Sequence, residues 1–221
     1  MEIKVSEDIK SLVPNFKVGV IHYSSITVSE SPQMLKGRLQ LFQESIYFDL
    51  EDKAVTDIEG IQEWRAIFKK VGTDPSRYRP SIEALYRRIK KQDYLHTINS
   101  AADLNNFFSL QYEVPIGIYD ADKINGEIEL KVGKPGDEYT GINGRLINME
   151  NKLLTGDSTG PFGSPFVDSE RTAVTEATKN AVQVIYLRPS LSVEQCEKLV
   201  QSLMDMFTQV NGGTGTFSIL S

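Results

Sequence analysis

Y-E-V-P-I-G-I-Y-D-A-D-K-I-N-G-E, residues 112–127, is the stretch of this chain that decides the fold. Its residues 115–119 are rich in β-branched and aromatic side chains, which predicts a strand. Asp120 and Asp122 then flank a turn that precedes Lys123. Aspartates before a turn commonly hydrogen-bond their own backbone, and we interpret these two as mainly architectural. A pair of carboxylates that works as general acid and base is the alternative.

Two further blocks flank this stretch. Residues 72–91 read G-T-D-P-S-R-Y-R-P-S-I-E-A-L-Y-R-R-I-K-K, where a turn at 73–75 precedes a helix. Pro80 suits the first position of that helix because its missing N–H is not needed there. Residues 169–180 read S-E-R-T-A-V-T-E-A-T-K-N and precede an apolar run, 182–187, that predicts a strand.

The remaining patterns alternate between helix and strand. Apolar spacing and β-branched runs predict strands over 16–28 and 127–132, short strands within 133–165, and helices over 32–49 and 58–71. Ser100 reads as the N-cap of a helix with Asp103 in its first turn. Ser192 and Gln195 form a capping box that opens a last helix, which ends at Gly212. We find no repeat, so we expect a single α+β domain over residues 1–221, with mixed sheets packed against helices.

Composition limits the class of protein. The chain has 221 residues and is 40% hydrophobic, which is ordinary for a globular domain. Cys196 is the only cysteine and falls on an apolar helix stripe, so we expect it to pack rather than react. An intrachain disulfide is impossible, which favours a reducing compartment. The charged N-terminus and the lack of a run of about 20 apolar residues predict neither signal peptide nor membrane helix, and we expect a cytoplasmic protein.

Charge and histidine content exclude some functions. The net charge is −6, whereas a protein that grips nucleic acid along its length is usually basic. Two histidines and one cysteine cannot build a Cys/His zinc site, so we expect no metal and no cofactor. The sequence leaves the oligomeric state open.

In order and spacing, the three blocks resemble the editing module of the phenylalanyl-tRNA synthetase beta subunit, a tRNA-binding module. The match covers roughly residues 60–190 and includes Pro115, Tyr119, Asp120, Lys123 and Gly126. The resemblance implies an α+β fold and hydrolysis of an aminoacyl ester at the 3′ end of a tRNA. Such an ester is already activated, so a site has only to position a water and stabilise the oxyanion.

The resemblance also implies site residues. It places Glu170 on the editing glutamate and puts Pro115 and Tyr119 near the pocket wall. A Thr172 hydroxyl would hold the ammonium or ribose of the substrate. Gly117 is a departure, because many synthetase modules carry a histidine there. The plainer alternatives are an exposed Glu170 paired with Arg171, and a structural Thr172.

A basic helix offers a possible RNA contact. Arg79, Arg87, Arg88 and Lys91 could meet phosphates, although a solvated helix face is the more common origin of such a run. Our hypothesis is a freestanding hydrolase that clears misacylated tRNA in trans, with the tRNA acceptor end and an amino-acid-like molecule as partners. A non-catalytic amino-acid or tRNA binding module is the alternative, and an interaction domain that docks on a synthetase or ribosome is a third. The chain is too short to hold an aminoacylation domain as well, so we expect no amino-acid activation.

Overall fold

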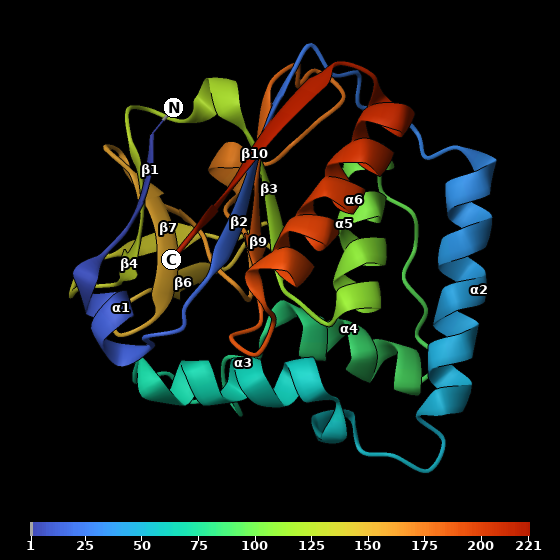
Figure 1. The fold of residues 1–221 in the computed structure, drawn as a ribbon, viewed down its shortest axis with the longest axis horizontal. Helices are drawn as coiled ribbons and strands as arrows, with labels where there is room; N and C mark the ends of the chain where they lie inside the picture. Colours follow the sequence, from blue (N-terminus) through green and yellow to red (C-terminus); the bar gives the residue numbers. More distant parts are fainter. Residues whose placement is uncertain (1) are drawn as a thin grey trace.

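A central antiparallel sheet organises the chain. The computed structural model describes residues 2–221. The sheet has the strand order β10-β2-β9-β3 (Figure 1). Its strands are β2 (Val18–Ser24), β3 (Ile116–Asp120), β9 (Ala181–Tyr186) and β10 (Thr214–Leu220).

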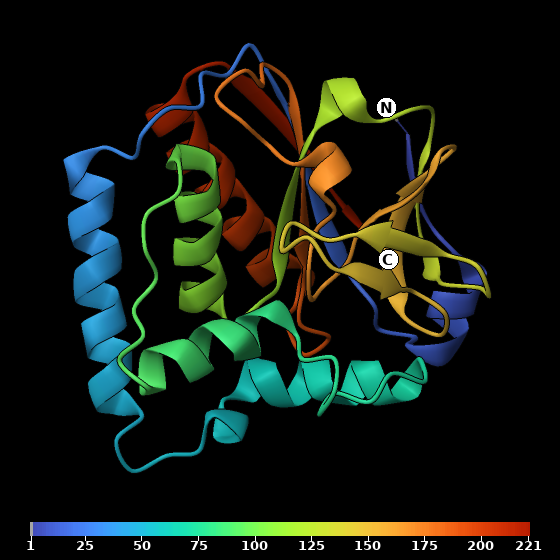
Figure 2. The same cartoon turned by 180° about the vertical axis from the view of Figure 1, so that it is seen from behind.

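The two faces of this sheet bury two different cores. Strand residues alternate between faces, so Val182 and Val184 of β9 enter one core while Ala181 and Ile185 enter the other. Helices cover the second of these faces: α2 (Gln33–Asp49), α4 (Ser81–Lys90), α5 (Ser100–Tyr112) and α6 (Val193–Asn211). Figures 1 and 2 show this helical layer on one side of the sheet and a smaller β layer on the other.

A second sheet of four strands covers the other face. Its order is β1-β4-β7-β8, built from β1 (Ile3–Val5), β4 (Ile128–Val132), β7 (Leu153–Asp157) and β8 (Gly160–Gly163). A hairpin of β5 (Glu138–Thr140) and β6 (Leu146–Asn148), the short helix α1 (Glu7–Leu12) and three 3₁₀ turns, η1 (Val55–Asp57), η2 (Ala121–Lys123) and η3 (Glu170–Thr172), complete the fold. Helix α3 (Glu59–Lys70) runs along the base of both layers in Figure 1. Its Trp64 and Phe68 side chains enter the core between the two sheets, whereas Ile61 enters the core under the helices.

The α+β class is therefore confirmed, and most expected elements lie where the sequence placed them. The capping box of Ser192 and Gln195 opens α6 as expected. The N-cap of α5 is different: Asn99, not Ser100, accepts the backbone N–H groups of Ala101 and Ala102. Ser100 instead uses its hydroxyl to accept the backbone N–H of Ser29.

Three elements escaped the sequence analysis, namely β1, α1 and β10. The strand expected over 16–28 is also shorter, because Ser25 adopts a left-handed φ of 57° just after β2 ends. Within residues 2–221, no helix combines the length and the apolar content needed to cross a membrane.

The cap of α5 provides a test of this structure. Asn99→Ala removes the acceptor for two backbone N–H groups, so we expect the free energy of unfolding to fall by about 1 kcal/mol. Asn106→Ala on the same helix is the matched control, because the structure gives the Asn106 side chain no capping role. Urea unfolding followed by circular dichroism measures both. Equal losses for the two variants would contradict the capping assignment.

Candidate functional site

The sequence blocks at 112–127 and 169–180 lie against each other. Strands β3 and β9 pair antiparallel, with Tyr119 opposite Val182. The Thr178 hydroxyl donates to Asp120 Oδ2 over 2.7 Å, and Asn180 Nδ2 donates to both oxygens of Asp122. Asp120 Oδ1 also accepts the backbone N–H of Asp122, as expected for a turn-forming aspartate. Both carboxylates therefore form hydrogen bonds that join the two blocks.

Gly117 lies beneath the end of a buried tyrosine. The Tyr119 hydroxyl donates to Asp168 Oδ1 over 2.8 Å, and Tyr119 has no exposed surface. A Cβ atom on Gly117 would lie 2.1 Å from the Tyr119 hydroxyl oxygen and 3.0 Å from Asp168 Oδ1. A Cβ on Gly163 would lie 2.2 Å from the same hydroxyl. Tyr119 therefore fits only because both positions are glycine, and its hydroxyl fills the place into which a side chain at 117 would project.

Tyrosines surround the Asp168 carboxyl group. Burial raises the pKa values of Tyr139 and Tyr186, and the nearby Asp168 charge raises both further. Burial raises the pKa of Asp168 to about 7, although the hydrogen bond from Tyr119 opposes this rise. No Lys or Arg within residues 2–221 forms an ion pair with Asp168. The Asp168 carboxyl group therefore accepts a hydrogen bond from a neutral tyrosine hydroxyl and has no cationic partner among these residues.

A groove of about 270 Å³ opens beside this cluster. Its walls come from β5, from the turn between β7 and β8, and from η3 with the residues just before it. Glu170 lines the groove and is exposed. Tyr139 lines it as well, and its hydroxyl bonds to Ser164 Oγ over 2.9 Å. Tyr139 therefore connects the wall of the groove to Ser164 and Val167, in the segment just before Asp168.

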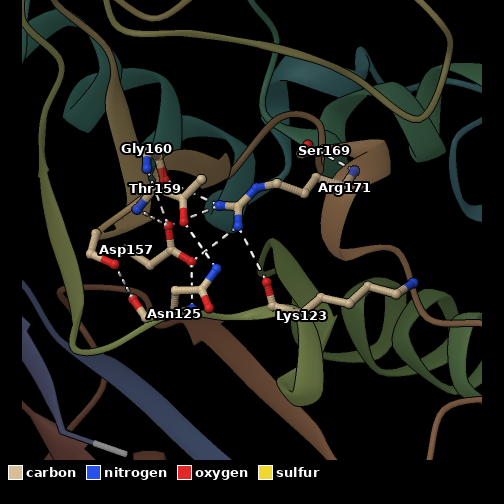
Figure 3. Close-up of polar contacts among 8 residues, drawn as sticks. Lys123, Asn125, Asp157, Thr159, Gly160, Ser169 and Arg171 are labelled. Atoms are coloured by element: carbon tan, nitrogen blue, oxygen red, sulfur yellow. Dashed lines mark hydrogen bonds and ion pairs between the residues drawn. The ribbon is translucent and has the colours of Figure 1, made fainter.

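An arginine–carboxylate clamp fixes the start of η3 (Figure 3). The Arg171 guanidinium donates to both oxygens of Asp157, over 3.1 and 3.0 Å, and to the carbonyl oxygens of Lys123 and Gly160. Burial alone would raise the pKa of Asp157, but hydrogen bonds from Arg171 and from the backbone N–H groups of Asn125 and Thr159 outweigh it and lower that pKa.

The clamp leaves Glu170 without the partner that one reading of the sequence gave it. Arg171 is engaged with Asp157, and no ion pair to Glu170 is formed within residues 2–221. The Ser169 hydroxyl accepts the backbone N–H of Arg171 and caps the turn. The Glu170 side chain therefore lines the groove, and the hydrogen bonds of Ser169 and Arg171 fix the backbone on both sides of it.

The other expected site residues are buried and do not line the groove. Pro115, Gly117 and Tyr119 are buried, and the Pro115 carbonyl accepts the backbone N–H of Tyr186. Thr172 is also fully buried, and its hydroxyl has no hydrogen-bond partner among residues 2–221. The structure brings Gly117 and Tyr119 together with Asp168, and it places Glu170 on the neighbouring surface. Asp168, Asp157 and Gly163 were missed, since no local pattern marks them.

The basic helix is largely engaged within the protein. Arg87 pairs with the fully buried Glu83, and Arg88 pairs with Asp93. Arg79 and Lys91 lie exposed at the two ends of α4, and no ion pair is formed by either within residues 2–221. Among the same residues, no group of three or more His, Cys, Asp and Glu side chains is arranged to hold a metal ion.

Comparison with known proteins places this arrangement in a family. Residues 63–204 match the family model described as the B3/4 domain. The chain belongs to the B3/4 domain family. This B3/4 domain is 34% identical over 216 residues to the uncharacterized protein YhzB of Bacillus subtilis, covering 98% of each chain.

The synthetase relatives are much longer. The phenylalanine–tRNA ligase beta subunit of Bartonella henselae is 26% identical over 113 residues, which cover 50% of this chain and 14% of that subunit. A solved N-terminal fragment of the phenylalanyl-tRNA synthetase beta subunit from Pyrococcus horikoshii aligns over 97% of this chain and 50% of that fragment, at 18% identity and a TM-score of 0.49. The sequence resemblance to the synthetase beta subunit is thus confirmed, while the domain spans a small part of the beta subunits that it matches.

Close packing around Gly117 leads to a prediction about stability. Gly117→Ala places a methyl group against the Tyr119 hydroxyl, so we expect a loss of roughly 1–3 kcal/mol in the free energy of unfolding. Gly37→Ala is the control, because nothing lies within 4 Å of its added Cβ and a helical alanine should stabilise by up to about 1 kcal/mol. Denaturant unfolding measures both. Adding Tyr119→Phe should recover part of the Gly117→Ala loss, and no recovery would contradict the clash.

The raised pKa of Asp168 predicts a pH dependence. The folded state holds the Asp168 proton more tightly than the unfolded chain does, so stability from this group is present below the ordinary pKa of 3.8 and is lost as pH rises towards about 7. Asp168→Asn removes the titration and keeps an acceptor for Tyr119. We therefore expect the variant to gain stability relative to the wild type between pH 4 and pH 7. Thermal unfolding across that range measures it, and parallel profiles would show that Asp168 does not titrate there.

Proposed function

We propose that this B3/4 domain hydrolyses misacylated tRNA in trans, with Glu170 orienting the attacking water. The observation that carries the proposal is Glu170 itself, an exposed carboxylate without an ion-pair partner within residues 2–221, in a groove of about 270 Å³. That volume lies near the lower limit for small-molecule sites and suits an aminoacyl group better than a whole nucleotide. Family membership supports the substrate class, since related domains occur in phenylalanine–tRNA ligase beta subunits.

Hydrolysis of an aminoacyl ester needs few catalytic groups. Water attacks the ester carbonyl carbon, its proton passes to the carboxylate, and the ribose oxygen leaves with a proton as the ester bond breaks. Glu170 would orient the water and accept its proton. Hydroxyl groups on the same walls, from Thr140 and Thr159, are of the kind that can donate to a developing oxyanion.

The position of α4 supports an RNA contact near the groove. The backbone N–H of Ser81 donates to the Pro165 carbonyl over 2.8 Å, which fixes the start of α4 against the segment that leads to Glu170. Exposed Arg79 lies next to this junction, whereas a ten-residue helix places Lys91 about 15 Å away. We propose that Arg79, and then Lys91, meet backbone phosphates, while Arg87 and Arg88 serve mainly their partners Glu83 and Asp93.

One observation favours a second candidate function, the binding of an amino acid without turnover. The Tyr119 hydroxyl fills the place above Gly117, so no side chain from this position can reach a substrate. The groove and the Glu170 carboxylate could then bind the ammonium group of an amino acid. Position 117 would supply no second residue for proton transfer.

Deacylation of a panel of mischarged tRNAs by the purified protein separates the two functions. Hydrolysis of one or more members supports the enzyme. Thermal stabilisation by a free amino acid, with every tRNA left intact, supports the binding module. Because the proposed mechanism uses a carboxylate and no metal, hydrolysis should persist in a chelator.

Glu170 is the residue on which the hydrolase depends. Glu170→Gln keeps the size of the side chain but removes its charge, so we expect deacylation to fall by roughly 10²-fold. Binding of the tRNA should change little, because the loss lies in the transition state. Glu176→Gln is the matched control, since Glu176 is exposed a few residues away and lies outside the groove. Rates that fall equally in both variants, or in neither, would remove Glu170 from the mechanism.

A further inference from the structure

A second groove shares none of its lining residues with the groove at Glu170. It is a groove of about 620 Å³ between helix α2 and the irregular segment 92–97, and we call it the α2 groove. Its volume lies in the middle of the range for small-molecule sites. Figure 2 shows α2 at the outer edge of the helical layer, and the segment after α4 passes alongside it. Helix α2 lies outside the residues that match the B3/4 model.

Gln43 lines this groove and uses only one end of its side-chain amide within the protein. Gln43 is only 2% exposed, and its Oε1 accepts the backbone N–H of Leu95 over 2.6 Å. Because a backbone N–H can bond only to the oxygen of the amide, the orientation of the amide is fixed. Nε2 is then the free polar atom, and it finds no acceptor within residues 2–221. Nε2 is not one of the fully buried side-chain atoms that lack a hydrogen bond. Because Gln43 lines the groove, a ligand acceptor can meet Nε2 there in place of water.

Other amides supply the complementary atoms. Gln40 donates its Nε2 to Glu44 over 3.2 Å, and Gln92 donates its Nε2 to the Tyr47 hydroxyl over 2.6 Å. Each keeps its carbonyl oxygen as an acceptor along the groove. The walls therefore present donors from one amide and acceptors from two others, which suits a ligand with both kinds of group.

Charge and shape narrow the ligand further. Lys36 is the one lysine or arginine that lines the groove among the described residues, and Glu30 already pairs with it. Glu44 and Asp93 on the same walls disfavour an anion such as a phosphate. Buried Leu39 and Leu95 give the groove an apolar floor. The aromatic rings of Tyr94 and His96 belong to the segment 92–97 that forms one of its walls. A flat, neutral ring with donors and acceptors on its edge satisfies these features.

We propose that the α2 groove binds a nucleobase. The donors and acceptors on a base edge can bond to the free amide N–H and C=O groups of this groove, and aromatic side chains stack on unpaired bases. The base can come from a free nucleoside or from an unpaired position of an RNA, and both share the same edge chemistry. The proposal does not depend on hydrolysis at Glu170.

NMR titration of the whole protein with the four ribonucleosides tests the proposal, with ribose alone as control. We expect the side-chain amide signals of Gln43 to shift with at least one nucleoside and not with ribose. Gln43→Glu keeps an oxygen for the Leu95 N–H but replaces the free donor by a charged acceptor, so affinity should fall at least tenfold. Gln62→Glu is the matched control, because it makes the same charge change at an exposed position of α3 and should leave the affinity unchanged.

Further arms keep the test decisive. If Gln43→Glu does not fold, His96→Ala removes an exposed ring and should weaken nucleoside binding severalfold. A short single-stranded RNA that binds more tightly than its nucleosides identifies RNA as the source, and equal affinity identifies the free nucleoside. Glu170→Gln should bind nucleosides normally, which separates this groove from the hydrolytic site. Absence of any shift at millimolar nucleoside, or binding that survives Gln43→Glu, would overturn the proposal.

Discussion

The hydrogen bond between the Tyr119 hydroxyl and Asp168 is the contact on which the candidate site depends. It joins β3 to a residue 49 positions later in the chain. Its acceptor is a carboxyl group whose pKa burial raises to about 7 and which has no cationic partner within residues 2–221. The bond requires glycine at 117 and at 163, because a Cβ at either position would overlap the tyrosine. A bridge between Tyr119 and Ala173 continues the same junction. Two glycines and one buried bond thus set the path of the backbone that carries Glu170.

The Arg171–Asp157 clamp fixes the other side of that backbone. Removing one partner of a buried ion pair is costly, although such a pair adds little net stability compared with apolar packing. Its value here is positional, because the guanidinium also holds the carbonyl oxygens of Lys123 and Gly160. Strands β7 and β8, the turn after β3 and the start of η3 are thereby tied together. The one side chain of this turn that stays exposed and without an ion pair within residues 2–221 is Glu170.

The sequence predicts this architecture where the signals are local. Apolar spacing located α2, α3 and α4, and a capping box located the start of α6. Strand β10 (T-G-T-F-S-I-L) escaped because glycine and small polar residues give it little strand character, and β2 supplies its pairing. Asp168 escaped for a related reason, since its partner is distant in sequence and its pKa is set by burial that no local pattern encodes. The family resemblance placed both sides of this junction at one pocket, but it did not indicate the hydrogen bond between Tyr119 and Asp168.

The occupied space above Gly117 limits which side chains can take part in the proposed hydrolysis. A histidine at 117 could not be accommodated beside Tyr119, because even a Cβ atom would lie 2.1 Å from the hydroxyl. In the proposed hydrolysis, a proton transfer near this position would have to use Tyr119 and Asp168, which occupy the space above Gly117. The alternative is a proton transfer on the groove side through Glu170. Tyr119 is fully buried, so a substrate in the groove cannot reach it while the bond to Asp168 is closed. In the proposed hydrolysis the groove side is therefore the accessible route, and the bond between Tyr119 and Asp168 has a structural role.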